Sequence, residues 1–371
     1  MTVQLDVSYR CDLNCVHCYL DNRTTWPELM TAEWLRVLDQ LAHLGTLFLV
    51  WSGGDVLQRA DFNQLLAAAC RLGFVSRIKT HAGAVTPATA ALWAASRVAR
   101  VDVSVYSLVP EVHDNITRSP GSLAATLRGI GCLIAEAVPV RVSVSVLDQT
   151  VDEIAALYRG LTALGCAVEF NMNVMRDLSA SSALDNLNLS PENRIRAEKL
   201  VWEHTRVDRA LPASVSTRQD SGPCGAGRTL GYISPDGALW PCVMFPMQLG
   251  HTREQSIAQI WRDSPQRQAL AAWTNRDRTG CQSCGGSGLC FYCPGEAFKT
   301  TGDFKVAPPH FHTRTRHAMQ GYEAARGPTF SAEDWASVPA GGAHPPRPDK
   351  FVFPIYRPRK GNGARVGKPA P

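Results

Sequence analysis

The chain has 371 residues, of which 45% are hydrophobic, and its formal net charge at pH 7 is +5. This length predicts two domains with sizeable cores, and the mild charge, mixed in sign along the chain, does not require a nucleic-acid partner. The N-terminus lacks the basic and apolar regions of a signal peptide and no run of about 18 apolar residues exists, so we expect a cytoplasmic protein without a membrane span.

Strand-like runs alternate with helix-like runs over the first 205 residues. The expected strands are residues 3–9, 46–53, 75–83, 100–107, 138–149 and 167–175. The helices expected to follow them are residues 31–45, 60–73, 86–96, 121–137, 150–165 and 190–205. Six such strand–helix units predict an α/β fold with a parallel sheet and right-handed crossovers.

Three of the expected strands alternate polar and apolar residues, whereas parallel strands buried on both faces are usually apolar throughout. The polar positions are Gln4, Asp6 and Ser8; Arg141, Ser143 and Ser145; and Glu169, Asn171 and Asn173. This alternation predicts a curved sheet, with helices on its outer face and a wet cavity on its inner face. The alternative is that these residues lie in loops at strand ends.

The twelve cysteines fall into an early group and a late group, with three isolated residues between them. Disulfides are not expected, because cytosolic thiols stay reduced. Cys70, Cys132 and Cys166 lie in apolar, helix-like stretches, and we interpret them as buried small hydrophobic residues.

The early group, in "RCDLNCVHCY" (10–19), has the spacing C-x3-C-x2-C and consists of Cys11, Cys15 and Cys18. It follows the first expected strand, at the carboxyl end where barrel-like α/β enzymes carry their chemistry. A structural zinc takes four ligands and a cubane cluster takes one per iron, so three thiolates leave one metal position open. The spacing alone is also compatible with chance or with a partial zinc site.

With His17 before the last cysteine, the spacing resembles the signature of the radical S-adenosylmethionine (SAM) enzymes. The resemblance implies a partial (β/α)6 barrel over residues 1–215. It implies that Cys11, Cys15 and Cys18 hold a [4Fe–4S] cluster whose fourth iron chelates SAM. An electron from a flavodoxin- or ferredoxin-type donor would cleave SAM to a 5′-deoxyadenosyl radical, which abstracts hydrogen from the substrate.

A second stretch, "WSGGDV" (51–56), resembles the Gly-Gly-Glu-Pro motif of the same family. The resemblance implies that Gly53, Gly54 and Asp55 hold the amino group of SAM. Asp55 replaces the family's glutamate and Val56 replaces its proline. The shorter Asp55 carboxylate would bond the SAM ammonium either directly or through a water molecule.

Further stretches of the first domain also resemble the family's SAM site. Ser104, in "DVSVYS", corresponds to a position that binds SAM, and Arg118, in "HDNITRSPGS", to an arginine that pairs with the SAM carboxylate. His17 corresponds to a position near the adenine. The resemblance covers the whole first domain.

Residues 216–328 show less helical and strand periodicity than the first 205 residues and contain more glycine and cysteine. This indicates a small domain held together by metal binding. "SPDG" (234–237) predicts a turn between two short strands that carry Cys224 and Cys242 near opposite ends of a hairpin. Asp236 is interpreted as a turn residue only. Downstream, "CQSCGGSGLCFYC" (281–293) is C-x2-C-x5-C-x2-C, which on its own is also typical of a zinc knuckle.

Together these two segments resemble the SPASM domain, an auxiliary module that follows the radical SAM barrel in peptide maturases and carries two further [4Fe–4S] clusters in its full pattern. The last gap here has two residues, Phe291 and Tyr292, where the family has three. The family's cysteine upstream of the hairpin and its cysteine downstream of the C-x2-C run are both missing.

We hypothesise that His312 replaces the downstream cysteine, so that an outer cluster uses Cys281, Cys284, Cys290 and His312. The alternative is that His312 is an exposed histidine near His310 and His317. The resemblance assigns Cys224, Cys242 and Cys293 to an inner cluster, with Asp220 or an open iron at the fourth position. A rival pairing places Cys281, Cys284, Cys290 and Cys293 on one metal.

The family resemblance implies a radical oxidoreductase that most often modifies a residue of a ribosomally synthesised peptide, by crosslinking, epimerisation or oxidation. The candidate substrate contacts near strand ends are His81, Tyr106, Glu169, Asn171 and Asn173. Since the first cluster motif begins at residue 11, leader recognition would need a separate leader-peptide-binding protein or the SPASM surface.

Two alternatives compete with the peptide hypothesis. One is a radical dehydrogenase or epimerase of a small sugar or aminocyclitol, and the remote one is a zinc-binding nucleic-acid module. Residues 329–371 are rich in Pro, Gly, Arg and Lys and are predicted to form a disordered basic tail.

Overall fold

One sheet runs through the computed structural model, which describes residues 1–20, 27–205, 210–211, 219–278 and 281–342. Within these residues the strand order is β6-β5-β4-β3-β2-β1-β7-β8-β9. The first six strands are β1 (Thr2–Ser8), β2 (Phe48–Gly53), β3 (Val75–Thr80), β4 (Arg100–Ser104), β5 (Val140–Ser145) and β6 (Ala167–Asn171). They pair in parallel, each with the next, which confirms the predicted α/β fold of parallel strand–helix units.

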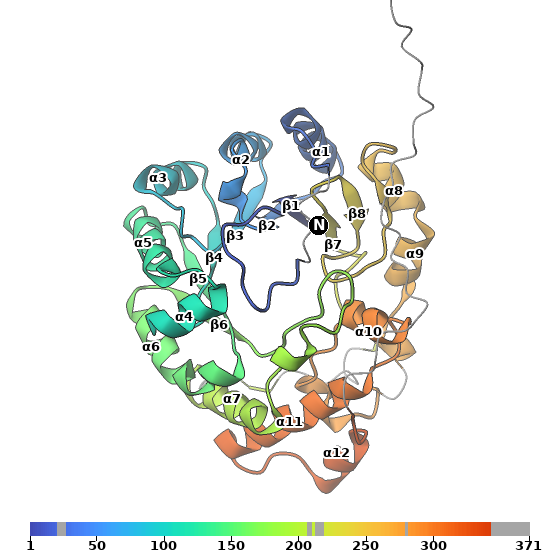
Figure 1. The fold of residues 1–371 in the computed structure, drawn as a ribbon. Helices are drawn as coiled ribbons and strands as arrows, with labels where there is room; N and C mark the ends of the chain where they lie inside the picture. Colours follow the sequence, from blue (N-terminus) through green and yellow to red (C-terminus); the bar gives the residue numbers. More distant parts are fainter. Residues whose placement is uncertain (21–26, 206–209, 212–218, 279–280, 343–371) are drawn as a thin grey trace, which may run out of the picture.

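The helices of this half lie outside the curved sheet, around a central space (Figure 1). They are α1 (Thr31–His43), α2 (Phe62–Arg71), α3 (Pro87–Ala95), α4 (Pro110–Thr117), α5 (Ser122–Ala135), α6 (Ile154–Ala163) and α7 (Pro191–His204). In α1 the buried residues are Trp34, Val37, Leu38 and Leu41, a helical spacing that turns one apolar stripe toward the sheet.

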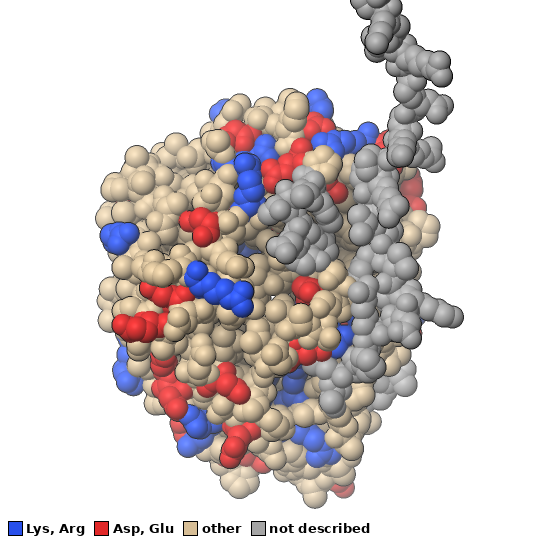
Figure 2. Space-filling model, in the orientation of Figure 1, with Lys and Arg blue, Asp and Glu red and all other residues tan. Residues whose placement is uncertain are grey.

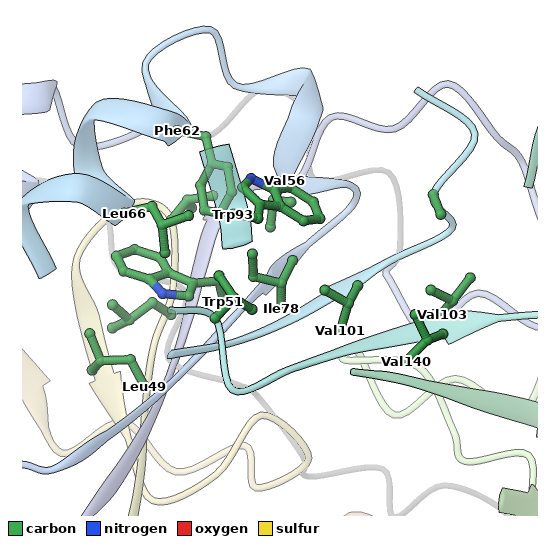
Figure 3. Close-up of a cluster of buried hydrophobic side chains, with 14 of the residues drawn as sticks. Leu49, Trp51, Val56, Phe62, Leu66, Ile78, Trp93, Val101, Val103 and Val140 are labelled. Carbon is green, nitrogen blue, oxygen red and sulfur yellow. The ribbon is translucent and has the colours of Figure 1, made fainter. Parts of the chain in front are cut away.

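Aromatic side chains fill the layer between strands and helices. Figure 3 shows Trp51 of β2 gathered with Phe62 and Leu66 of α2 and Trp93 of α3. Phe62 meets Trp51 and Trp93 edge to face, with ring centroids 5.6 and 6.2 Å apart. Truncating such a buried aromatic residue to alanine typically costs about 3–5 kcal/mol of stability, so this layer holds the barrel wall in place.

The polar residues of the alternating strands lie on the inner face of the sheet, as predicted. In β5, Val140, Val142 and Val144 are buried on the helix side, while Arg141 and Ser143 lie on the other face and line a cavity. The inner face of the sheet is therefore polar, and it surrounds the site described below.

The sheet continues into the C-terminal half through β7 (Leu230–Ile233), which pairs in parallel with β1. β8 (Ala238–Trp240) and β9 (Gly250–His251) follow in antiparallel pairing, so the predicted hairpin is present. Asp236 is a turn residue, as expected: its carboxylate accepts hydrogen bonds from the Ser234 hydroxyl and the Ala238 N–H.

The C-terminal half contains more helix than its sequence pattern indicates. Its helices are α8 (Ile257–Asp263), α9 (Pro265–Ala272), α10 (Pro294–Thr301), α11 (Pro309–Arg326) and α12 (Ala332–Ser337), and they lie across the central space from α2 and α3 (Figure 1). α11 packs on α7 so closely that a Cβ on Gly321 would lie 2.7 Å from the Ile195 carbonyl oxygen.

The predicted disordered tail begins at residue 329, yet residues 332–337 form α12. Its N-cap Ser331 and Asp334 bond each other's backbone N–H groups in a capping box, which explains a helix in so short a segment. Residues 343–371 lie outside the described residues. Among the described helices, none combines the length and apolar character needed to cross a bilayer.

Candidate active site and metal centres

The loop that carries Cys11, Cys15 and Cys18 is fastened to the Gly-Gly-Asp turn after β2. The N–H of Gly54 donates to the Ser8 carbonyl and the N–H of Asp55 to the Arg10 carbonyl, both at 2.9 Å. A Cβ on Gly53 would lie 2.0 Å from the Ser8 oxygen, and one on Gly54 would lie 2.2 Å from the Arg10 oxygen. Only glycines permit this approach, and Gly53 also has a φ of +137°.

The far side of the same loop is fastened to α4. The N–H groups of Asn14 and Val16 donate to the carbonyls of Thr117 and Ile116, at 3.1 and 2.9 Å. These carbonyls belong to the last turn of α4, where no intrahelical donor is available to them. Backbone bonds at both ends therefore hold the cysteine loop before any metal binds.

The three cysteines share one cavity of about 460 Å³ on the inner face of the sheet. Cys11 and Cys18 are exposed and Cys15 is half-buried. Among the described residues, the cavity wall holds these three cysteines and no fourth. Burial, and then the neighbouring Cys18, raise the pKa of Cys15 to about 12, so the thiolate needs a cation beside it.

Four of the six predicted SAM contacts lie in the wall of this cavity: His17, Gly53, Gly54 and Ser104. The His17 ring meets Tyr106 edge to face, with centroids 4.6 Å apart. Burial lowers the pKa of His17 to about 4, so the ring is neutral at physiological pH.

Asp55 does not face the cavity. Its side chain is 1% exposed, and its carboxylate accepts from the Leu57 N–H at 2.9 Å, the Thr80 hydroxyl at 2.5 Å and the His81 N–H at 3.0 Å. In this structure Asp55 braces the turn of its motif against the end of β3.

Arg118 also lies apart from the cavity wall. It is an exposed residue in the left-handed conformation (φ 55°) that ends α4. Its contact with the SAM carboxylate stays a prediction.

His81 lies beside the first cysteine. Its Nε2 is 2.8 Å from Asp12 Oδ1, and its Nδ1 accepts from the Gly83 N–H at 3.1 Å, so both ring nitrogens are engaged. Of the other predicted substrate contacts, Tyr106, Glu169 and Asn171 line the cavity. Asn173 instead accepts a hydrogen bond from the Arg194 guanidinium at 2.9 Å.

A charged floor closes the cavity, and the sequence analysis did not identify it as a site. Asp102 accepts from Nε of Arg100 and from Nε of Arg141, both at 2.8 Å, and Arg141 also pairs with Glu169 at 2.5 Å. The Lys79 ammonium donates to the Gln4 amide oxygen at 3.4 Å and also acts on the charge of Asp6. In the sequence, the spacing of two residues between Arg77 and Lys79 indicates that both lie on the same face of β3.

Beyond this floor lies a smaller chamber of about 160 Å³, which shares Lys79, Asp102 and Arg141 with the main cavity. Its wall includes Cys242. The main cavity, the charged floor and the chamber thus form a polar path from the three-cysteine loop to the C-terminal cysteines.

The structure divides the late cysteines into two groups. Cys224 and Cys242 pack against the small core around Phe245. Burial raises the pKa of Cys224, and the nearby Cys242 raises it further. Burial, Glu296 and Cys242 raise the pKa of Cys293 to about 12. Cys242 thus has both other inner cysteines as neighbours.

The remaining three, Cys281, Cys284 and Cys290, line a separate pocket, and Cys293 does not line it. His312 lies in this second pocket. Asp220, the proposed alternative ligand, is exposed, and its carboxylate accepts from Nε of Arg276 at 2.6 Å.

The spacing of ligand atoms bears on which metal these groups suit. A tetrahedral zinc with Zn–S bonds of about 2.3 Å needs sulfurs about 3.8 Å apart. Among the described residues, only Cys11, Asp12 and His81 bring three ligand atoms within 4.8 Å of one another. Neither C-terminal group brings three ligand atoms as close as that among the described residues.

Comparisons with known proteins agree with this geometry. Residues 5–161 match the radical SAM superfamily, and residues 224–285 match SPASM, an iron–sulfur cluster-binding domain. An AdoMet-dependent heme synthase of Methanosarcina barkeri is 26% identical over 81% of this chain and 93% of its own length. A PqqA peptide cyclase of Granulibacter bethesdensis is 24% identical over 96% of this chain and 98% of its own.

Two solved structures have a similar fold. Streptococcus suis SuiB bound to its precursor peptide SuiA superposes with a TM-score of 0.65, at 17% identity over 82% of this chain and 74% of SuiB. Native anSMEcpe with bound AdoMet gives a TM-score of 0.69, at 13% identity over 88% of this chain and 96% of that one.

Proposed function

Since this chain is a radical SAM enzyme with a C-terminal SPASM domain, we propose that it abstracts hydrogen from one residue of a ribosomally synthesised peptide and leaves that residue crosslinked, epimerised or oxidised. Its cofactors are SAM and [4Fe–4S] clusters, as predicted. When bound, the first cluster and SAM supply the hydrogen-abstracting radical, and the protein supplies position and exclusion of water.

The observation that carries the proposal is the size and shape of the cavity. Its volume of about 460 Å³ must hold SAM as well as the reacting group. Pockets for a whole small ligand span about 300–1,000 Å³, so little more than one side chain of the substrate fits beside SAM. A peptide can insert a single side chain into this space and leave its backbone outside.

The wall provides polar groups that suit an inserted residue. Ser143, Glu169 and Asn171 project from β5 and β6, and the Asn171 amide donates to the Ser143 hydroxyl at 2.9 Å. The PqqA peptide cyclase, similar over nearly the full length of both chains, acts by its name on a peptide, and SuiB, with a similar fold, binds one.

A second candidate is conversion of a tetrapyrrole, suggested by the similarity to heme synthases. The observation that favours it is the pair Arg77 and Lys79 in the smaller chamber, because such cations suit the carboxylates that haem-type tetrapyrroles bear. A macrocycle needs more room beside SAM than the cavity offers, so we rank it second.

The nucleic-acid alternative has no support in the structure. On the face that Figure 2 shows, lysine and arginine side chains are interspersed with aspartate and glutamate side chains, and no continuous basic surface forms there. Binding to phosphate backbones depends on such a surface.

The test is an anaerobic assay of the reconstituted protein with SAM, dithionite and a candidate peptide, taken from any short open reading frame beside its gene. The proposal predicts release of 5′-deoxyadenosine and a peptide whose mass or stereochemistry has changed, with neither product from a Cys15→Ala protein. An unchanged peptide, together with turnover of a carboxylated iron porphyrin, would instead establish the second candidate. In cells the reaction would also need a flavodoxin- or ferredoxin-type donor, and the leader would be bound by the SPASM surface or by a separate protein.

A further inference from the structure

The outer cysteine group lies against one face of α11. Gly286, in the short 3-10 helix η6 (Gly285–Gly288) between Cys284 and Cys290, is so close that a Cβ there would lie 2.6 Å from Thr315 Cγ2 and 2.8 Å from Met319 Sδ. Thr315 lines the same pocket as Cys290, and its hydroxyl donates to the Phe311 carbonyl at 2.8 Å. Residues three and four apart share a helix face, so His312 projects from the face that carries Thr315 and Met319.

His312 lines the same pocket as Cys281, Cys284 and Cys290. Among the described residues it has no hydrogen bond or ion pair, so its ring nitrogens are available to a ligand. The neighbouring histidines differ: His310 Nε2 is 3.0 Å from Glu296 Oε1, and His317 is five residues further along, away from the pocket wall.

The pocket is enclosed from a second side by the segment after α11. The N–H of Gly285 donates to the Ser337 hydroxyl at 2.8 Å, and Val338 and Pro339 complete the wall. Three thiols and one imidazole thus converge on a space that α11 and α12 shield from water, and no other cysteine, aspartate, glutamate or histidine lines it among the described residues.

From this arrangement we propose that His312 is the fourth protein ligand of the outer auxiliary site, which is a [4Fe–4S] centre of Cys281, Cys284, Cys290 and His312. Three thiolates and one imidazole provide one ligand for each iron of a cubane, and residues 224–285 match an iron–sulfur cluster-binding domain. A neutral imidazole in place of a thiolate makes the centre less negative by one charge. Its reduction potential is therefore higher than that of an all-cysteine cluster.

The proposal concerns the SPASM domain alone and holds whatever the substrate is. It is tested without turnover, on the full chain reconstituted anaerobically and without SAM. Pulsed EPR compares reduced protein grown with ordinary histidine and with ¹⁵N-histidine. The wild type is expected to show a strong histidine-nitrogen coupling that changes with the label, and His317→Ala, the matched control on the same helix, is expected to keep it.

Two variants of His312 then test whether this residue is the source of the nitrogen coupling. His312→Ala is expected to lose the coupling together with one cluster's share of iron and sulfide, or to show the signal of a three-iron centre. His312→Cys is expected to keep the full iron content, lose the coupling and titrate at a lower potential. The proposal is overturned by a wild type without labelled-histidine coupling, by a coupling that survives His312→Cys, or by an unchanged potential in that variant.

Discussion

The carbonyl oxygen of Arg10 accepts a hydrogen bond of 2.9 Å from the N–H of Asp55, which ties the residue before the first cysteine to the Gly-Gly-Asp turn. Gly54 precedes Asp55, and a Cβ added to Gly54 would lie 2.2 Å from that same oxygen. A side chain at this point must push the cysteine loop away from the turn.

Gly54→Ala is therefore expected to weaken SAM binding at least tenfold and to lower the iron content of the three-cysteine site, because the loop must move by more than a packed backbone allows. Equilibrium dialysis with SAM and iron analysis measure the two effects. The matched control is Gly131→Ala in α5, where an added Cβ has no neighbour within 4 Å. It should bind SAM normally and gain about 0.5–1 kcal/mol of stability.

Asp55→Asn is expected to destabilise the fold by about 1–3 kcal/mol, since the amide replaces an acceptor oxygen and leaves one buried donor among Leu57, Thr80 and His81 without its partner. Denaturant unfolding measures the change. Asp39→Asn, on the exposed face of α1, should remain within about 0.5 kcal/mol of the wild type. Equal stabilities for the two variants would contradict the bracing role of Asp55.

Cys15→Ala is expected to abolish 5′-deoxyadenosine formation and to remove one cluster's share of iron, while the C-terminal cysteines keep theirs. The reason is that Cys15 lies in the SAM cavity, apart from both other groups. Iron analysis and chromatography of the nucleoside measure the two effects. Cys70→Ala, in α2, should change neither, and SAM cleavage that persists in Cys15→Ala protein would rule out the assigned site.

Lys79→Gln is expected to separate SAM cleavage from substrate modification. The exposed Lys79 ammonium lines the cavity and holds a single long hydrogen bond, to the Gln4 amide oxygen, among the hydrogen bonds of the described residues, so an acidic group of the substrate can reach it. Losing a charge-assisted hydrogen bond should raise KM for the substrate about tenfold or more, with substrate-free SAM cleavage unchanged. Arg71→Gln, at the end of α2 on the outer surface, serves as the control, and equal KM values would exclude Lys79 from binding.

The buried Asp6 gives a pH dependence of stability. Burial raises its pKa from 3.8 to about 6, although Gln4 and Tyr232 donate hydrogen bonds to it. Between these two values the unfolded chain has lost its proton and the folded chain has not. The wild type therefore loses stability as pH rises through this range, and above about pH 6 the whole loss in free energy of unfolding is present.

Asp6→Asn removes the ionisation, so its melting temperature relative to wild type should increase from pH 5 to pH 7.5. Scanning calorimetry of the anaerobic protein measures the difference. A difference that stays constant, or that shrinks as pH rises, would show that the carboxyl is not protonated in the fold.

The sequence predicts the parts of this molecule that depend on local pattern. The valine alternation at 140–145 revealed both the strand and the polar inner face, and the spacing of Cys11, Cys15 and Cys18 identified the chemistry. α11 was missed because its histidines, arginines and threonines mask its apolar stripe. The pairing of β7 with β1 joins residues more than two hundred positions apart, which no local pattern encodes.

The cationic floor was missed for a related reason. The alternation of β5 placed Arg141 on the inner face, but only the parallel register of β4 and β5 brings it to Asp102, which Arg100 of the same strand also contacts. The role of Asp55 likewise depends on the end of β3, whose Thr80 and His81 the motif does not include.

Because β7 is hydrogen-bonded directly to β1, the loop that carries Cys11, Cys15 and Cys18 and the hairpin that leads to Cys242 are attached to a single continuous sheet. Electron tunnelling falls off steeply with distance, so a hinge between the two would make transfer irregular. If both parts bind their clusters, the β1–β7 ladder would keep the distance between them fixed, so that electron transfer would not depend on a movement of one half against the other.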